Sequence, residues 1–315
     1  MSEVKKIATR ESYGNALIEL AATDPDIVVL DADLAAATMT KMFKGAHPER
    51  FIDCGIAECD MMGIAAGLAA TGKKVFASSF AMFAAGRAFE VVRNSIGYPH
   101  LPVKICATHA GISVGEDGAS HQCCEDIALM RVIPGMTVLN PSDDVETKAV
   151  IKALLTYDGP AYVRLGRLAV PVINDHPDYH FEIGKGIELK PGNDVAILAT
   201  GLMVGAAIEA GEILKGQGID ARVINIHTIK PLDEEIVLRA AKETGLLVTV
   251  EEHNVIGGFG SAVSEFLSEH YPTRVIKVGV QDCFGQSGPA VGLLEKYGLT
   301  AEHIVATVKQ AVQGK

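Results

Sequence analysis

The sequence lacks tryptophan, has few aromatic residues, and carries no surplus of positive charge. Its 315 residues include 28 lysines and arginines against 39 aspartates and glutamates, which gives a formal net charge of −11. A nucleic-acid partner needs a basic face, so this balance argues against one. No segment is of low complexity, and hydrophobic residues make up 48% of the chain. This composition is typical of a globular enzyme, and the length suffices for two packed domains.

Paired cysteines and long hydrophobic runs are also missing. The six cysteines form no Cys-x-x-Cys pair. A chain of this length does not depend on disulfides, so reduced thiols in the cytoplasm are expected. Residues 1–6 contain lysines without a following apolar region, which gives no indication of a signal peptide. The most apolar window, residues 61–86, is interrupted by Lys73 and Lys74, so we expect no membrane span.

Apolar strand-like runs alternate with helical stretches along the whole chain. Continuous apolar strands separated by helices predict parallel sheets that are covered on both faces. Residues 171–191 are polar and rich in proline and histidine, which indicates a linker or surface excursion. The sequence therefore predicts an α/β fold of two doubly wound domains with mainly parallel sheets, residues 1–185 and 186–315. The strand candidates include residues 27–30, 74–77, 103–106, 162–165, 194–201, 221–226, 246–250 and 274–278.

One acidic residue directly precedes a run of small residues. Glu58 follows Gly55-Ile56-Ala57, and the Gly/Ala-rich run extends from Met62 to Ala70. Small residues let a helix pack closely on another backbone, and an acid at the helix start gains from the positive end of the helix dipole. A glutamate presented in this way suits a buried acid–base task. A glutamate in a first helical turn is also common for structural reasons, so the spacing alone leaves both interpretations open.

Aromatic and histidine residues cluster in the next part of the chain. Phe80 and Phe83 are three residues apart and share one face if the segment is helical. The glycine-rich loop at residues 111–121 follows a predicted buried strand, where parallel α/β sheets gather ligands. His109 and His121 flank this loop and offer two imidazoles for proton transfer near neutral pH. Each residue alone is equally compatible with packing or surface exposure, whereas the combination favours a site.

In order and content, these segments resemble the transketolase family over nearly the whole chain. The resemblance runs from Ala8-Thr9-Arg10 to Phe284-Gly285-Gln286-Ser287-Gly288, and the loop Gly115-Glu116-Asp117-Gly118-Ala119-Ser120-His121-Gln122 is a specific part of it. It implies a pyrimidine-binding domain followed by a transketolase C-terminal domain, the latter mainly for assembly and self-association. Transketolases use thiamine diphosphate, so this cofactor is implied as well.

The resemblance also implies roles around the cofactor. In the family, the position of Glu58 hydrogen-bonds the aminopyrimidine ring and favours the tautomer that removes the thiazolium C2 proton. Glu58 is thus implied to be catalytic and cofactor-binding. The position of Phe83 stacks against the aminopyrimidine, and that of Phe80 lines the same pocket. Some relatives carry a further aromatic residue where this chain has Gly86, so the pocket is expected to be reshaped there.

The same comparison implies a sugar channel. His109, Asp117 and His121 match positions that contact substrate hydroxyls, and His121 is also implied to be catalytic. Arg10 and Arg167 match positions that bind a sugar phosphate, for which a guanidinium fork is well suited. Surface ion pairs are the competing interpretation for both arginines.

Two departures from the family pattern bear on substrate and site. Many relatives carry a phosphate-binding serine where this chain has Ala37, so the substrate is expected to be a ketose that is usually, but not necessarily, phosphorylated. Cys59-Asp60 replaces the Gln-Asn or Gln-His pair that commonly follows the glutamate.

A motif that thiamine enzymes need is absent from the sequence. The cofactor diphosphate requires a cation, Mg²⁺ or Ca²⁺, held by a Gly-Asp-Gly sequence and a later asparagine. The sequence contains no Gly-Asp-Gly, so no metal ligand is assigned to this chain. We therefore expect the C-terminal subunit of a split transketolase, in which a separate N-terminal subunit carries that motif and shares the active site. The pair is expected to transfer a two-carbon ketol unit from a ketose to an aldose, as in pentose phosphate metabolism.

Three alternatives remain open at this stage. The first is the β subunit of a 2-oxoacid dehydrogenase, which has the same domain pair. The second is half of an enzyme like deoxyxylulose-phosphate synthase, which would require pyruvate as donor. The third is a non-catalytic assembly subunit, to which the departures at Ala37, Cys59-Asp60 and Gly86 give some weight.

Overall fold

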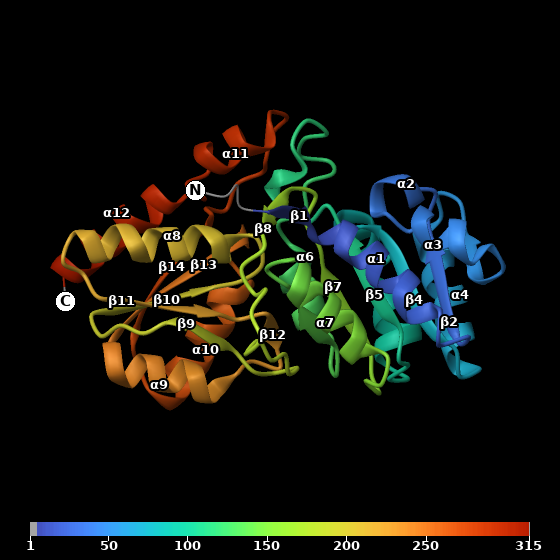
Figure 1. Cartoon of the computed structure of the whole chain (residues 1–315), viewed down its shortest axis with the longest axis horizontal. Coiled ribbons are helices and arrows are strands. Elements are labelled where there is room, and N and C mark those ends of the chain that lie inside the picture. The colour runs from blue at the N-terminus through green and yellow to red at the C-terminus, as the bar shows by residue number, and fades with distance from the viewer. Residues whose placement is uncertain (1–4, 315) are drawn as a thin grey trace.

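The computed structural model describes residues 5–314 and forms two lobes side by side, each built on its own sheet (Figure 1). The lobe coloured blue to green contains a seven-stranded sheet, and the lobe coloured yellow to red contains a five-stranded one. Both sheets are mostly parallel and are packed between helices, which confirms the predicted α/β fold. Among the described residues, no helix has both the length and the apolarity needed to cross a membrane.

The larger sheet has the strand order β12-β6-β7-β5-β4-β2-β3, and only its β12–β6 pair is antiparallel. Its edge strand β12 comes from a later part of the chain than the other six, so the chain returns to the first lobe after starting the second. The strands are β2 Ile27–Asp31, β3 Phe51–Asp53, β4 Lys74–Phe80, β5 Lys104–Thr108, β6 Thr137–Leu139, β7 Ala161–Arg164 and β12 Thr228–Lys230.

The smaller sheet has the order β14-β13-β10-β11-β9, with only β11–β9 antiparallel. A separate antiparallel pair, β1 with β8, ties the start of the chain to the end of the first lobe. Strand β9 lies within the polar segment predicted to be a linker. It is a partly exposed edge strand, so its sequence has no hydrophobic run from which a strand could be predicted. The strands are β1 Lys6–Ala8, β8 Ala169–Pro171, β9 Ile187–Lys190, β10 Val195–Ala199, β11 Ala221–Asn225, β13 Leu246–Asn254 and β14 Arg274–Val280.

Helices connect the strands and cover the sheets. The α-helices are α1 Thr9–Ala21, α2 Ala35–Thr38, α3 Lys41–Ala46, α4 Glu58–Ala70, α5 Phe89–Val91, α6 Asp126–Arg131, α7 Asp144–Leu154, α8 Met203–Gly216, α9 Glu234–Thr244, α10 Phe259–His270, α11 Ala290–Lys296 and α12 Ala301–Gln313. Short 3-10 turns occur at η1 Pro48–Arg50 and η4 Ile112–Val114, and π-helical turns at η2 Met82–Arg87 and η3 Val92–Gly97. Helix α7 begins after Asp143, whose side chain accepts a hydrogen bond from the Glu146 N–H and caps the helix.

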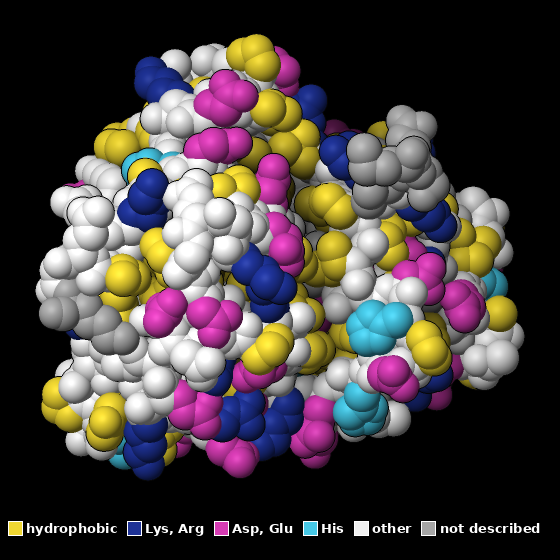
Figure 2. All heavy atoms as spheres, turned by 60° about the vertical axis from the view of Figure 1, so that its left-hand side comes forward, with side chains coloured by type: hydrophobic (Ala, Val, Ile, Leu, Met, Phe, Trp, Pro, Cys, Tyr) yellow, Lys and Arg dark blue, Asp and Glu magenta, His cyan; other side chains and the backbone are white. Residues whose placement is uncertain are grey.

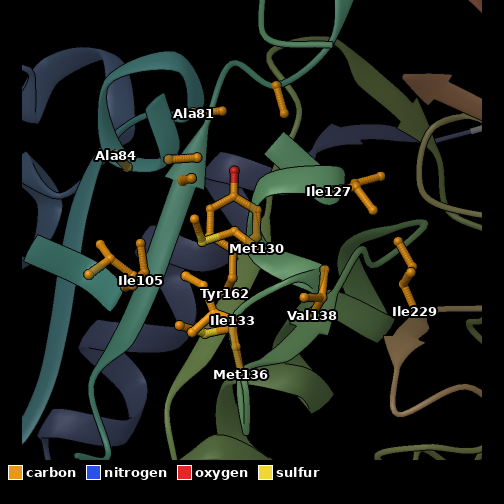
Figure 3. Close-up of a cluster of buried hydrophobic side chains, with 14 of the residues drawn as sticks. Ala81, Ala84, Ile105, Ile127, Met130, Ile133, Met136, Val138, Tyr162 and Ile229 are labelled. Carbon is orange, nitrogen blue, oxygen red and sulfur yellow. The ribbon is translucent and has the colours of Figure 1, made fainter. Parts of the chain in front are cut away.

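The hydrophobic core continues from one lobe into the other. One buried cluster contains residues of the larger sheet, such as Ile105, and residues of the smaller sheet, such as Leu247. Figure 3 shows the part around Tyr162, where Met130, Ile133 and neighbouring side chains fill the space beside the sheet. Some charged groups are buried beside this core, such as the Arg164–Asp126 ion pair, and the face in Figure 2 carries acidic and basic side chains interspersed.

Candidate active site

The predicted site residues follow the carboxyl ends of neighbouring parallel strands. Strand β4 ends at Phe80 and lies in register with the end of β5, so Phe80 is opposite Thr108 and next to His109. Arg167 follows the end of β7, and Glu58 follows the end of β3. Because the strands are parallel, all these ends meet at one edge of the sheet, where α/β proteins bind ligands.

Four rings form a continuous aromatic cluster at this edge. The Phe80 ring stacks on the His109 imidazole with centroids 3.9 Å apart, and on the Phe83 ring at 6.1 Å. The edge contact between Phe83 and His121 spans 5.3 Å. Phe80 is the last residue of β4, whereas Phe83 lies in the π-helical turn η2, so the two residues do not share one helix and the condition for a common helical face is not met. The rings still meet, because the chain turns directly after the strand.

His109 is held as a neutral imidazole of defined tautomer. The Arg10 guanidinium can only donate, so the 3.3 Å contact from its Nη1 makes the Nε2 of His109 an acceptor. The proton then resides on Nδ1, which donates to the Thr108 hydroxyl at 2.9 Å. Burial, with help from the nearby positive charges of Arg10 and Arg167, lowers the pKa of His109 to about 3. His109 therefore stays uncharged at neutral pH and cannot serve as a cationic acid.

His121 differs from His109 in exposure and in its partners. Its side chain is half-buried, and its Nδ1 lies 3.0 Å from the Ser120 hydroxyl. No hydrogen bond to its Nε2 occurs within residues 5–314, so that nitrogen is available to a bound molecule. Of the two predicted histidines, His121 is thus the better proton carrier.

Glu58 is the first residue of α4, as predicted. Gly55 turns the chain ahead of it with a φ of 69°, a left-handed conformation that glycine adopts without strain. The Glu58 side chain is only 4% exposed, yet its carboxylate has no hydrogen-bond or ionic partner among the described residues. A thiol contact of 3.5 Å from Cys59 Sγ to the Arg87 carbonyl joins this turn to the end of η2. The Glu58 oxygens are not fully closed off from solvent, so they can accept a hydrogen bond from a ligand or another chain.

The two arginines lie close enough to influence each other. Burial, followed by the charge of Arg167, lowers the pKa of Arg10. Arg167 donates to Glu116 Oε2 at 2.7 Å and also to the Val114 carbonyl. The hydrogen bond from Arg167 lowers the pKa of Glu116. Asp117, the next residue of the loop, is exposed and contacts none of the other predicted site residues in the described chain.

Two of the departures from the family pattern have visible structural consequences. At the expected serine position, the Ala37 carbonyl accepts a hydrogen bond of 2.8 Å from Arg10 Nη1, so this arginine is anchored without a hydroxyl. At Gly86, a side-chain methyl group would collide with the terminal methyl group of Met82. Met82 therefore occupies space at the position where some relatives carry a further ring.

Sequence reasoning missed the residues that hold the site in shape. Thr108 accepts the hydrogen bond from Nδ1 of His109, and only its position beside a histidine could have signalled that role. Gln122 is buried and donates to the Ile112 carbonyl at 3.1 Å and the Gln286 carbonyl at 2.9 Å. Within the part of the chain that the structure describes, no group of three or more His, Cys, Asp or Glu side chains could hold a metal ion.

Comparison with known proteins identifies both lobes. Residues 5–172 match the family model described as "Transketolase, pyrimidine binding domain", and residues 184–304 match "Transketolase, C-terminal domain". The chain is 51% identical over 306 residues to a putative transketolase C-terminal section of Methanocaldococcus jannaschii, with 96% of each chain covered. It is 47% identical to a 6-deoxy-6-sulfo-D-fructose transketolase subunit of Clostridium sp. (strain MSTE9), covering 97% of this chain and 95% of that protein.

A solved structure agrees with these relatives. The structure described as "Split gene transketolase, inactive beta4 tetramer" has a TM-score of 0.89 and 53% identity to this chain, with 98% of this chain and 99% of that chain covered. The chain therefore belongs to the transketolase family and corresponds in sequence and fold to the C-terminal section of a split transketolase.

Proposed function

We propose that this chain is the C-terminal subunit of a thiamine-diphosphate-dependent transketolase that moves a two-carbon ketol unit from a ketose to an aldose. The observation that carries the proposal is Glu58: a buried carboxylate at a helix start, beside an aromatic cluster, without a partner among residues 5–314. An N-terminal subunit with the Gly-Asp-Gly motif would complete the site and hold the Mg²⁺ or Ca²⁺ of the cofactor.

The residues at the site fit the cofactor's pyrimidine ring. The half-buried ring of Phe83 gives a flat heteroaromatic a stacking surface, and Phe80 closes the pocket behind it. The Glu58 carboxylate would accept a hydrogen bond from a nitrogen of that ring, which would satisfy its unmet hydrogen-bond capacity. Bound there, thiamine diphosphate supplies the nucleophilic carbon and the electron sink needed to break a carbon–carbon bond beside a carbonyl.

The chain's own residues handle the protons of the sugar. His121, with Nε2 available, takes a proton from a substrate hydroxyl as the carbon–carbon bond breaks and returns it when the acceptor aldose adds. The neutral imidazole of His109, held between Arg10 and Thr108, orients rather than protonates. Asp117 contributes a carboxylate that can accept from a sugar hydroxyl at the channel mouth.

Arg10 and Arg167 are proposed to bind an anionic group at the far end of the sugar. Two guanidinium groups near each other are stabilised by a shared anion, and their forks match the oxygens of phosphate or sulfonate. The substrate of the relative from Clostridium carries a sulfonate in its printed name, which is consistent with an anionic substrate here. Because Ala37 lacks the hydroxyl with which many relatives bind phosphate, we propose that the two arginines accept either a phosphate or a sulfonate group.

Assembly with a second subunit can be tested directly. The chain would be purified alone and together with an N-terminal transketolase subunit of its host, and thiamine diphosphate binding would be followed by calorimetry in the presence of Mg²⁺. The proposal predicts binding and sugar turnover only for the pair. The described solved relative is an inactive tetramer, which supports self-association through the C-terminal half and inactivity of this chain alone. A pair that binds no cofactor would favour a non-catalytic assembly subunit instead.

A further inference from the structure

The loop between His109 and His121 depends on contacts from outside itself. It contains three glycines in the left-handed region, Gly111, Gly115 and Gly118, with φ values between 75° and 87°. Its own backbone hydrogen bonds form turns in its second half, such as the 3.0 Å bond from the His121 N–H to the Gly118 carbonyl, whereas the Ser113 N–H bonds to a side chain from outside the loop. A loop of this kind is held in one conformation only if neighbouring segments fix it.

A carboxylate of the second lobe provides one of these contacts. Glu252 lies on β13, is 3% exposed, and accepts a hydrogen bond of 2.6 Å from the backbone N–H of Ser113. Its carboxyl group lies directly against Gly111, where any added side-chain carbon would overlap it. Because Gly111 has no side chain, the Glu252 carboxyl group can lie close enough to the loop to bond the Ser113 N–H.

Glu252 is itself held at its backbone by Arg164 and at its carboxyl group by Ser113. The Arg164 guanidinium donates to its backbone carbonyl at 2.8 Å and ion-pairs with Asp126 at 2.8 Å. Burial raises the pKa of Glu252, while the charge of Arg164 and the Ser113 N–H oppose that rise. A buried carboxyl group held by these contacts keeps a fixed position.

We propose that Glu252 is a positioning residue of the active site: from the second lobe it holds Ser113 and thereby the loop that carries the imidazoles of His109 and His121. This gives the C-terminal domain a role in setting the sugar channel, in addition to assembly. The expected effect on sugar binding rests on the proposed function, whereas the effect on the loop does not.

The test compares two substitutions of the same residue in the full chain. Glu252→Gln keeps an oxygen that can accept from the Ser113 N–H, and Glu252→Ala removes it. Hydrogen–deuterium exchange followed by mass spectrometry would report on residues 111–122. We expect exchange there to speed up about tenfold in the alanine variant and to stay near wild type in the glutamine variant. The control is Glu265→Ala, which removes an exposed carboxylate of the same lobe that pairs with Arg131.

Kinetics of the assembled enzyme add a second readout. The alanine variant should raise the KM for the ketose about tenfold with a smaller change in kcat, and the glutamine variant should restore it. Unchanged exchange of residues 111–122 in both variants would overturn the proposal. So would equal acceleration of exchange over both lobes in both variants, because that result indicates a purely structural role. A wild-type pair without turnover would contradict the proposed function, and the exchange comparison would still decide whether Glu252 holds the loop.

Discussion

The two sheets share one architecture, yet Glu58 near the larger sheet differs from two buried acids on the smaller sheet in how far its carboxylate is satisfied. Within the described residues of the larger sheet's lobe, Glu58 is buried without a partner, and the Nε2 of His121 accepts or donates no hydrogen bond. On β13 of the smaller sheet, both acids are bonded. Glu251 accepts from the Phe259 and Gly260 N–H groups at 2.6 and 2.8 Å, and Glu252 accepts from Ser113.

This difference separates a site from a scaffold. The fold alone does not identify an active site, because proteins with the same parallel-sheet fold have many unrelated functions. Buried polar groups are normally satisfied, so those that are not point to a missing ligand or subunit. In this comparison Glu58 is the candidate for a missing ligand, whereas Glu251 and Glu252 support the structure.

The largest effect is expected at the unpartnered carboxylate. Glu58→Gln should lower kcat of the assembled enzyme by roughly 10²–10⁴-fold, because the acid–base contact to the cofactor is lost while the shape is kept. Asp60→Asn, an exposed acid in the same helical turn, is the matched control and should have little effect. Full turnover of the glutamine variant would remove the distinction between the two lobes.

Arginine substitutions should give the next largest effect. Arg10→Ala removes a guanidinium from the proposed anion site, so the KM for a phosphorylated or sulfonated sugar should rise roughly 10- to 100-fold with a smaller change in kcat. Arg239→Ala, an exposed arginine of the second lobe paired with Glu188, serves as control. Equal KM values for charged and uncharged sugars in the wild type would show that no anion is bound there.

A buried histidine outside the site should affect stability and not catalysis. Burial lowers the pKa of His227 to about 4. Between about pH 6.5 and about pH 4, His227 therefore binds a proton in the unfolded chain and stays neutral in the folded chain. The contribution of His227 to stability should thus be lost as the pH falls from about 6.5 to about 4, by ~1.4 kcal/mol per pH unit. Urea unfolding of wild type and His227→Asn across this range measures the difference. Parallel pH dependences in the two proteins would contradict it.

The smallest effect is expected at Ala37, where many relatives carry a serine. Ala37→Ser restores a hydroxyl next to the Arg10 anchor, and should lower the KM for a phosphorylated sugar by roughly fivefold, the value of one ordinary hydrogen bond. Steady-state kinetics with phosphorylated and sulfonated donors would show whether the gain is specific for phosphate. A higher KM for both would mean that the alanine fits the site better.

Much of the fold follows from the sequence because it depends on local patterns. The apolar runs at residues 27–30 and 74–77 predicted β2 and β4, and the acid before the small-residue run predicted the start of α4. Strands β9 and β12 were missed, since edge strands of three or four residues lack a clear hydrophobic pattern.

The sequence named side chains that the structure brings together, their roles stay predictions, and their geometry was not predicted. Family resemblance named Phe80, His109 and His121, and the structure brings these rings together. The neutral state of His109 and the support from Glu252 could not be predicted, because they depend on contacts between residues far apart in the chain. Such contacts leave no spacing signal in a single sequence.

The most direct test of the central claim follows the two-carbon unit itself. A ketose labelled with ¹³C at C1 and C2 would be incubated with an unlabelled aldose, thiamine diphosphate, Mg²⁺ and the two-subunit enzyme, and the products would be identified by NMR. The account predicts that both labels move together, still bonded, into a new ketose, and that transfer stops without this chain or with Glu58→Gln. Labels that stay in the donor, or product formation that requires pyruvate or another 2-oxoacid, would contradict it.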